Sequence, residues 1–522
     1  MITIELSILL LVDDWVSKGR RIDRRWLKNA VAIRIIKSPG KDAARLKDQR
    51  VTRRDLIRRV GASAAAGLAM GLPGVAQTQV PPTQQQTPTP SEEKTPKSES
   101  EVAKKYPHFP GTFINRPLTQ ISTAVDTLLD DMEGRGAAYF YDQAHPQTGL
   151  VRDHAPVVGL STSRVASIAA TGFGLSALCI AAHRNYLSPS LCERRVETTL
   201  AFLLERCPHV HGFLYHFLDI ESGQRLFGSE LSSIDTSLLL SGILLCRKYF
   251  DGNYRIKALA TTLYERVDWK WMLNGSDTMS MGWLPESGFI QYRWDVYAEM
   301  LTMLLMAIGA PRNAIPPSSW NAVSRPILEF GGIQYISGVA PLFIHQYAHA
   351  WCDFRNMRDQ HANYFLNSIA ATRAHQLFCL TLGHQFPWMN QNLWGITASE
   401  SPTGYRVWGG PPDFGGIDGT IVPCATAGSL IFLPAECSHV LFSIREKYGE
   451  KAWTRYGFID AFQPQSDWYA EDQLGIDLGI SILMAENLRT GFCWNYFMRN
   501  TEITRAMQAV GFQADTGDNG PA

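Results

Sequence analysis

Closely spaced cysteine pairs and long apolar runs are scarce in this sequence of 522 residues. Its nine cysteines are scattered, as at Cys179, Cys246, Cys379 and Cys493, and none forms a CxxC pair with the spacing of metal ligands. We therefore interpret most of them as small core hydrophobes, and nothing indicates a disulfide scaffold. An odd number of cysteines in an exported chain also leaves at least one thiol without an intramolecular partner.

Several signatures of catalysis are also absent. The sequence has no nucleophile elbow, no P-loop and no Gly-rich dinucleotide fingerprint, and the prolines in residues 409–416 are incompatible with a usual phosphate nest. His345 and His349 have the i, i+4 spacing of a helical face, but no Glu follows His345 as in zinc proteases. A metal site there is a minor alternative, and we expect neither a metal nor a cofactor.

The net charge of zero hides an uneven distribution. Residues 1–60 hold 16 of the 49 basic residues but 7 of the 49 acidic ones, so the rest of the chain is mildly acidic. An acidic surface repels nucleic-acid phosphates and anionic headgroups. We expect no nucleic-acid partner and no membrane span, and a neutral sugar fits better.

The first hundred residues are typical of export rather than of a folded domain. Residues 51–76 contain Arg53 and Arg54 before a small, weakly apolar run, which is the layout of a twin-arginine signal; an amphipathic helix with a chance arginine pair is the alternative. Residues 1–50 are interpreted as an over-extended start or a basic extension, and residues 77–105 as a disordered Pro/Thr/Gln-rich linker. The expected location is periplasmic or secreted, with the twin-arginine machinery as a partner.

Residues 106–505 are expected to form one helical domain, followed by a flexible tail at 506–522. Apolar residues recur there at i, i+3, i+4 and i+7, whereas strand-like alternation is limited to Gly331–Val339 and Ser429–Leu433. The predicted helices are Ser161–Arg184, Ser190–Arg206, Ile234–Tyr249, Ile256–Trp271, Asp295–Ile308, Tyr364–Leu382 and Ile480–Asn500. Helical hairpins with polar and aromatic connections favour an all-α, closed double ring over an open solenoid.

Acidic residues among apolar neighbours are the candidates for chemistry, because burial raises the pKa of a carboxyl group and makes it a usable general acid. Glu299 is a lone carboxylate in an otherwise apolar predicted helix, which is costly unless it faces a wet cavity. Asp235, near the start of a helix that Ser232 or Ser233 can cap, and Asp477, close to glycines, are suited either to a site or to capping. Further candidates near these segments are Glu230 and Glu286.

Large aromatic residues gather around these acids. In predicted loops or at helix starts, aromatic rings are less needed for the core and can stack on pyranose rings. As a set they favour a carbohydrate cleft, although each ring alone is better explained by packing. The set is Trp283, Trp294, Tyr297, Trp394, Tyr405, Trp408, Trp468 and Tyr469.

Several stretches resemble the glucoamylase-like domain family, which includes bacterial endo-β-1,2-glucanases and the glucan-processing domain of cyclic β-1,2-glucan synthases. The resemblance spans residues 139–500. The stretches that carry it are Thr148–Asp153, Ala169–Gly174, Phe213–Asp219 with Ser233–Thr236, Trp294–Glu299, and Leu474–Gly479 with Glu486–Gly491.

This resemblance implies an (α/α)6 toroid with a central cleft and an inverting mechanism. It implies Glu299 as the general acid and Asp477 on the base side, with Glu230, Asp235 and Asp153 binding sugar. One departure is the pair Asp477-Leu478, where the family usually has aspartate and glutamine. The loss of this polar group implies a shifted substrate preference.

Together these observations predict an exported glycoside hydrolase that cleaves a glucan, with β-1,2-glucan as the candidate substrate, by two carboxyl groups. One alternative is a transglycosylase that acts on the same glucan. Another is a non-catalytic glycan-binding envelope protein on the same toroid. A third is an all-helical lyase or epimerase in which Tyr215 or His216 transfers protons.

Overall fold

The computed structural model describes residues 121–338, 341–411 and 416–515. The predicted N-terminal extension (1–50), export signal (51–76) and linker (77–105) lie outside the described residues. No helix in the described ranges is both long enough and apolar enough to cross a bilayer.

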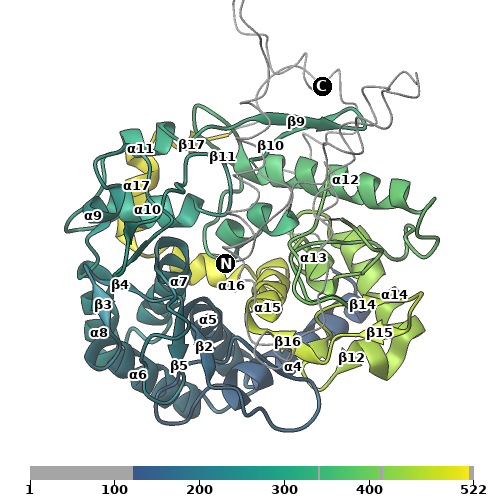
Figure 1. Ribbon diagram of the computed structural model, residues 1–522, viewed down its shortest axis with the longest axis horizontal. Coiled ribbons are helices and arrows are strands. Elements are labelled where there is room, and N and C mark those ends of the chain that lie inside the picture. Colours follow the sequence, from purple (N-terminus) through teal and green to yellow (C-terminus); the bar gives the residue numbers. More distant parts are fainter. Residues whose placement is uncertain (1–120, 339–340, 412–415, 516–522) are drawn as a thin grey trace, which may run out of the picture. The chain divides into compact units, whose positions relative to one another are not determined.

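Outer and inner helices alternate along the described chain (Figure 1). The outer helices are α4 (Thr123–Asp142), α6 (Pro189–Glu205), α8 (Tyr254–Glu265), α12 (Tyr364–Leu382) and α14 (Pro434–Ala452). The inner helices are α5 (Ile168–Arg184), α7 (Ser233–Tyr249), α10 (Leu301–Gly309), α13 (Pro423–Ala427) and α15 (Gly475–Arg489), with the 3-10 helices η2 (Leu342–His345) and η3 (Tyr347–Ala350). Inner helices pack on one another in the order α10, α7, α5, α15 and α13, and η3 packs on α15. This alternation is that of the predicted (α/α)6 toroid.

The inner helices are buried on all sides. Every residue of α5 from Ile168 to Ala182, of α7 from Ser233 to Arg247 and of α15 from Gly475 to Leu488 is buried. A helix that is apolar all round belongs in the interior of a large domain, whereas α6 and α8 bury one stripe each. Helices α5 and α7 approach so closely that a Cβ at Gly172 or Gly242 would overlap the backbone of the other helix.

Short antiparallel strands fix where the inner helices begin. Strand β2 (Val165–Ser167) pairs with β5 (Phe217–Asp219) and leads into α5, while β6 (Leu231–Ser232) pairs with β7 (Gly282–Leu284) and leads into α7. Strand β16 (Asp472–Leu474) pairs with β1 (His154–Pro156) and leads into α15. The N-terminal ends of three inner helices are therefore held by strand pairs.

The other described strands are equally short and lie mainly in hairpins. They are β3 (His209–Val210), β4 (Phe213–Leu214), β8 (Gly288–Phe289), β9 (Ile327–Phe330), β10 (Ile333–Ile336), β11 (Met357–Arg358), β12 (Trp453–Thr454), β13 (Gly457–Phe458), β14 (Phe462–Gln463), β15 (Trp468–Tyr469) and β17 (Gln513–Ala514). The remaining helices are α9 (Trp269–Leu273), α11 (Ser318–Asn321), α16 (Phe492–Phe497) and α17 (Thr501–Ala509). The strand candidate Gly331–Val339 is confirmed as β10, but Ser429–Leu433 forms turns and not a strand.

Several predicted boundaries are wrong. The predicted helix Asp295–Ile308 begins only at Leu301, because Tyr297 and Ser324 are tied by a backbone hydrogen bond. The predicted helix Ile480–Asn500 is broken at Gly491, whose φ of 69° is left-handed. The tail predicted at 506–522 is too long, since Met507 and Phe512 are buried and β17 pairs with β11.

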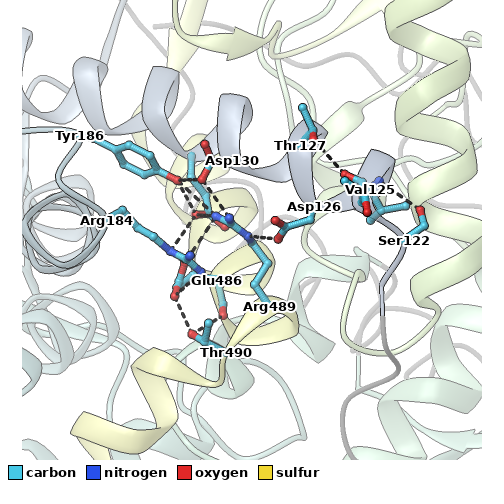
Figure 2. A network of polar contacts seen from close by, with 12 residues as sticks. Ser122, Val125, Asp126, Thr127, Asp130, Arg184, Tyr186, Glu486, Arg489 and Thr490 are labelled. Atoms are coloured by element: carbon cyan, nitrogen blue, oxygen red, sulfur yellow. Dashed lines mark hydrogen bonds and ion pairs between the residues drawn. The ribbon is translucent and has the colours of Figure 1, made fainter.

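An ion-pair network joins α4, α5 and α15 at the C-terminal ends of the two inner helices (Figure 2). Arg489 donates to Asp126, Asp130 and Glu133, at 2.8, 2.9 and 2.6 Å. Arg184 donates to both carboxylate oxygens of Glu486, at 2.9 and 3.1 Å. Burial and the charge of Glu486 raise the pKa of Glu133 well above its ordinary value. Two arginines thus compensate two fully buried carboxyl groups.

All nine cysteines are free thiols and buried, as the sequence predicts. Cys179 on α5 and Cys246 on α7 have their sulfur atoms 3.5 Å apart. Burial raises the pKa of the Cys179 thiol well above its ordinary value. A buried thiol of this kind acts as a small apolar side chain and not as a nucleophile.

Candidate functional site

Candidate acids lie at the N-terminal ends of three inner helices. Asp235 is in the first turn of α7, Asp477 is in the first turn of α15, and Glu299 is in the turn just before α10. All three side chains are buried, with residue exposures of 3, 4 and 2%. Helix N-termini carry partial positive charge, which favours carboxylates there.

The start of α7 is built by a reciprocal cap. The Ser232 hydroxyl accepts a hydrogen bond from the backbone N–H of Asp235 at 3.0 Å and also donates to Asp235 Oδ2. The predicted cap is therefore confirmed with Ser232, and Asp235 lies inside the helix. Its second contact is with a histidine that the strands bring beside it.

His216 lies between two carboxyl groups. Its Nδ1 is 3.2 Å from Glu230 Oε1, and its Nε2 is 3.7 Å from Asp235 Oδ2. The backbone N–H of His216 also donates to the carbonyl of Glu230 at 2.9 Å, which fixes the approach of the two residues. The contact with Glu230 is within hydrogen-bond range, whereas 3.7 Å to Asp235 is an ion-pair distance, which is attractive when the ring carries both protons.

Among the described residues, His216, Glu230 and Asp235 form the group whose residue types and spacing could hold a metal ion. Their potential ligand atoms all lie within 4.8 Å of one another. His345 and His349, the histidines singled out by spacing, lie instead in η2 and η3, and burial lowers the pKa of each to about 3. His345 meets the Tyr297 hydroxyl at 3.4 Å and Ser337 at 3.2 Å, so these two histidines are neutral core residues.

Asp477 lies near a second buried acid, Asp460. It lines a small enclosed cavity with Cys424 of α13, Gln473 of β16 and Asp460, and no Lys, Arg or His lines that cavity. Burial first, and then the charge of Asp477, raise the pKa of Asp460 well above its ordinary value. Leu474, and not Asp477, occupies the N-cap position of α15, so the interpretation of Asp477 as a cap is wrong.

Asp153 lies beside the start of α15. Its carbonyl accepts the N–H of Gly475 at 2.8 Å, and its carboxylate contacts His154 Nδ1 at 3.1 Å. His154 Nε2 lies 3.6 Å from Asp472 Oδ2. A Cβ at Gly475 would press on Ala170 of α5, so the glycine permits this close approach.

Four of the aromatic candidates are part of the core. Trp294, Tyr297, Trp394 and Trp408 lie outside helices, as expected, but they are at most 2% exposed, so packing explains these four rings, as the interpretation of each ring alone predicts. The Trp294 indole donates to Ser233 Oγ at 2.9 Å, and the ring of Tyr297 stacks on that of Tyr364. They help to shape the inner wall, and contact with sugar stays a prediction for each.

The remaining candidates lie nearer the surface. Trp468 and Tyr469 on β15 are half-buried, and the Tyr469 ring stacks on Phe462. Glu286, in the turn between β7 and β8, pairs with Arg225 at 2.5 Å, and this contact lowers its pKa. Because Arg225 also acts electrostatically on Glu230, Glu286 belongs to the outer edge of the α7 cluster.

Sequence reasoning missed Asp460 and gave His216 a different role. Asp460 stands alone in the apolar run Tyr456–Phe462, which is the pattern that singled out Glu299. His216 was considered only for proton transfer in a lyase or epimerase, with Tyr215. In the structure Tyr215 instead lies under the guanidinium of Arg225, 4.9 Å from its ring centre.

Comparisons with known proteins agree with this architecture. The Glycoamylase family model, which describes glucoamylases, matches residues 291–501. The exo β-1,2-glucooligosaccharide sophorohydrolase of Parabacteroides distasonis is 24% identical over 423 residues, which cover 74% of this chain and 58% of that protein. This chain therefore spans less than two thirds of the length of the curated relative.

Solved structures are similar over three quarters of the chain. The endo-β-1,2-glucanase of Chitinophaga pinensis, in complex with sophorotriose and glucose, has a TM-score of 0.69 and 26% identity over 75% of this chain and 99% of that one. A β-1,2-glucanase of Parabacteroides distasonis has a TM-score of 0.70 and 23% identity over 75% of this chain and 60% of that one. The (α/α)6 fold is thereby confirmed. The matched residues 291–501 include Glu299 and Asp477, and over this part the chain is similar to the Glycoamylase family.

Proposed function

We propose that this protein is a glycoside hydrolase that cleaves β-1,2-linked glucan with inversion at the anomeric carbon. The observation that carries the proposal is a pair of buried acids, Glu299 and Asp477, at the N-terminal ends of two inner helices within the family match. The substrate comes from the relatives, whose names refer to β-1,2-glucan or its oligosaccharides. No cofactor is needed for this chemistry.

In the proposed reaction the two acids have different tasks. Glu299 protonates the oxygen of the leaving sugar, and Asp477 takes a proton from the water that attacks the opposite face of the ring. Glu230, Asp235 and Asp153 accept hydrogen bonds from sugar hydroxyl groups. Leu478, at the position where the family usually has glutamine, provides no polar contact and is expected to alter the preferred substrate.

Export is part of the proposal. The arginine pair at Arg53 and Arg54 supports transport of the folded protein by the twin-arginine route to the periplasm or beyond. We expect the double change of both arginines to lysine to keep the protein in the cytoplasmic fraction. Unchanged export of this variant would contradict the route.

The direct test is release of reducing ends by the purified protein from β-1,2-, β-1,3-, β-1,4- and α-1,4-glucans. Activity is expected on the β-1,2 linkage and is expected to be lost in Glu299→Gln and Asp477→Asn. Glu265→Gln, at the end of outer helix α8, is the matched control and is expected to keep full activity.

The outcome also separates the rival functions. A folded protein that is silent on every linkage would overturn the hydrolase assignment. Longer products without new reducing ends, seen by mass spectrometry, would identify a transglycosylase. Saturable oligosaccharide binding with no product would identify a glycan-binding protein.

A further inference from the structure

A second carboxyl group, that of Asp460, lines the same cavity as Asp477 and is also buried. Asp460 follows β13 and is 1% exposed. Its Oδ2 accepts the backbone N–H of Glu400 at 2.9 Å. Its Oδ1 has no hydrogen-bond partner among the described residues, and the side chain lines the same small cavity as Asp477.

Three of the side chains that line this cavity, Asp460, Gln473 and Asp477, carry acceptor oxygens. Gln473, which is 2% exposed, contributes to the lining, and its Oε1 has no donor among the described residues. Ionised Asp460 and Asp477 would add carboxylate oxygens, which only accept. Two ionised carboxylates that line one small cavity repel each other, so a proton held by one of them is favoured.

We propose that Asp460 is a positioning residue that keeps a proton at neutral pH and presents it to Asp477, holding the Asp477 carboxylate ionised and oriented for its task as base. This inference rests on the proposed function for the role of Asp477. It assigns Asp460 no contact with substrate. The proton stays on the Asp460 side, and the water that attacks the sugar loses its proton to Asp477.

The surroundings of Asp460 agree with a protonated group. The titratable groups that face it are Asp477 on α15, Glu400 in the segment between α12 and α13, and Cys424 on α13. Burial and the charges of Asp477 and Glu400 raise the pKa of Asp460, and only the Glu400 N–H lowers it. The Cys424 thiol also stays protonated, because burial and the two aspartates raise its pKa.

Two substitutions of Asp460 separate a proton donor from a carboxylate. Asparagine has the shape of the protonated acid and keeps a hydrogen-bond donor, so Asp460→Asn is expected to retain kcat within about threefold. Leucine has no donor, so Asp477 loses its orientation in Asp460→Leu. This variant is expected to have a kcat lower on the order of 10²-fold and an unchanged KM. Equal inactivity of the two variants would show that Asp460 acts as a carboxylate and would overturn the proposal. Equal activity of both would overturn the positioning role.

Infrared difference spectra between neutral and alkaline pH give a test that does not need activity. They are recorded in a background with both Glu133→Gln and Glu299→Gln, because Glu133 is another buried carboxyl with a raised pKa and Glu299, the proposed general acid, also holds a proton. The C=O stretch of a protonated carboxyl is expected at neutral pH and is expected to vanish in Asp460→Asn. Its absence before that substitution would overturn the proposal. If the band is present but the wild-type protein does not cleave glucan, the proposed function fails while Asp460 still holds its proton.

Discussion

Helix α15 holds a buried carboxyl group near each end, and the surroundings of the two differ. Asp477 lies in the first turn, and Glu486 lies nine residues later, about 14 Å along the helix. Glu486 and its neighbour Glu133 are compensated by Arg184 and Arg489 (Figure 2). Asp477 and its neighbour Asp460 share a cavity that is lined by no basic residue.

The comparison separates a structural charge cluster from a chemical one. Arg489 at the C-terminal end of α15 and Arg184 at that of α5 interact favourably with the helix dipoles and tie α4, α5 and α15 together. At the N-terminal end, no basic residue lines the cavity to offset the repulsion that Asp460 and Asp477 would have if both were ionised. A protein keeps such an arrangement where perturbed acid groups serve a function.

Exchanging each acid of α15 for its amide should give opposite results. Asp477→Asn is expected to lower kcat by about 10²- to 10⁴-fold, because it removes the proposed base, while the melting temperature changes little. Glu486→Gln is expected to lower the melting temperature and to leave kcat per folded molecule unchanged. Kinetics and calorimetry on both variants measure kcat and the melting temperature. Full activity of Asp477→Asn would contradict the assignment of different roles to the two acids.

Removing an arginine from the structural cluster should destabilise the protein strongly. The Arg489 side chain is buried and is shared by Asp126, Asp130 and Glu133, so Arg489→Met removes the cation that joins three acids and is expected to cost about 3–5 kcal/mol of unfolding free energy. Arg312→Met, at a side chain that is 75% exposed, is the matched control and is expected to change little. Urea unfolding measures the free energy of unfolding of both variants. Similar decreases in the two would show that the buried ion pairs of Arg489 contribute no more to stability than an exposed pair.

The raised pKa of Glu133 predicts how stability depends on pH. The folded protein binds a proton at Glu133 more tightly than the unfolded chain does, so its contribution to stability is present below the ordinary carboxyl pKa of about 4.3 and is lost as pH rises through the higher folded value. Glu133→Gln removes this loss. Urea midpoints across that pH window should fall less steeply in the variant, and parallel curves would contradict the prediction.

At the start of α7, a histidine lies between two carboxyl groups, so the compensating charge comes from neither an arginine nor a second acid. The smallest expected effect on activity is that of removing metal ions from this cluster. His216, held between Glu230 and Asp235, provides the positive charge when its ring carries both protons. We therefore expect exhaustive treatment with a chelator to leave kcat/KM unchanged. Reversible loss of activity, restored by one divalent cation, would instead assign these side chains to a metal.

Most of the helical architecture could be predicted from the sequence. The bounds of α12 agree with the predicted helix Tyr364–Leu382, while α6 differs by one residue at both boundaries and α7 by one residue at its start. Their apolar periodicity and clear caps make such helices local features. Helix α10 is the counterexample, because its start depends on the pairing of Tyr297 with Ser324, which no local pattern reveals.

The candidate site was harder to predict, since its parts come from distant segments. Glu299, Asp235 and Asp477 stood out as single acids in apolar surroundings, and all three are buried as that pattern implies. The pairing of Asp477 with Asp460, and of His216 with Asp235, depends on tertiary packing. The burial of Trp394 and Trp408 has the same cause, because a ring in a loop segment can still pack into the core.

The central claim is that the protein hydrolyses β-1,2-glucan with inversion, and proton NMR of the first anomer released tests it most directly. The enzyme is mixed with β-1,2-glucan, and the new anomeric signals are followed before mutarotation equilibrates them. We predict that the α-anomer accumulates first and that Glu299→Gln releases neither anomer. Release of the β-anomer first, or no cleavage by the folded wild-type protein, would contradict the account.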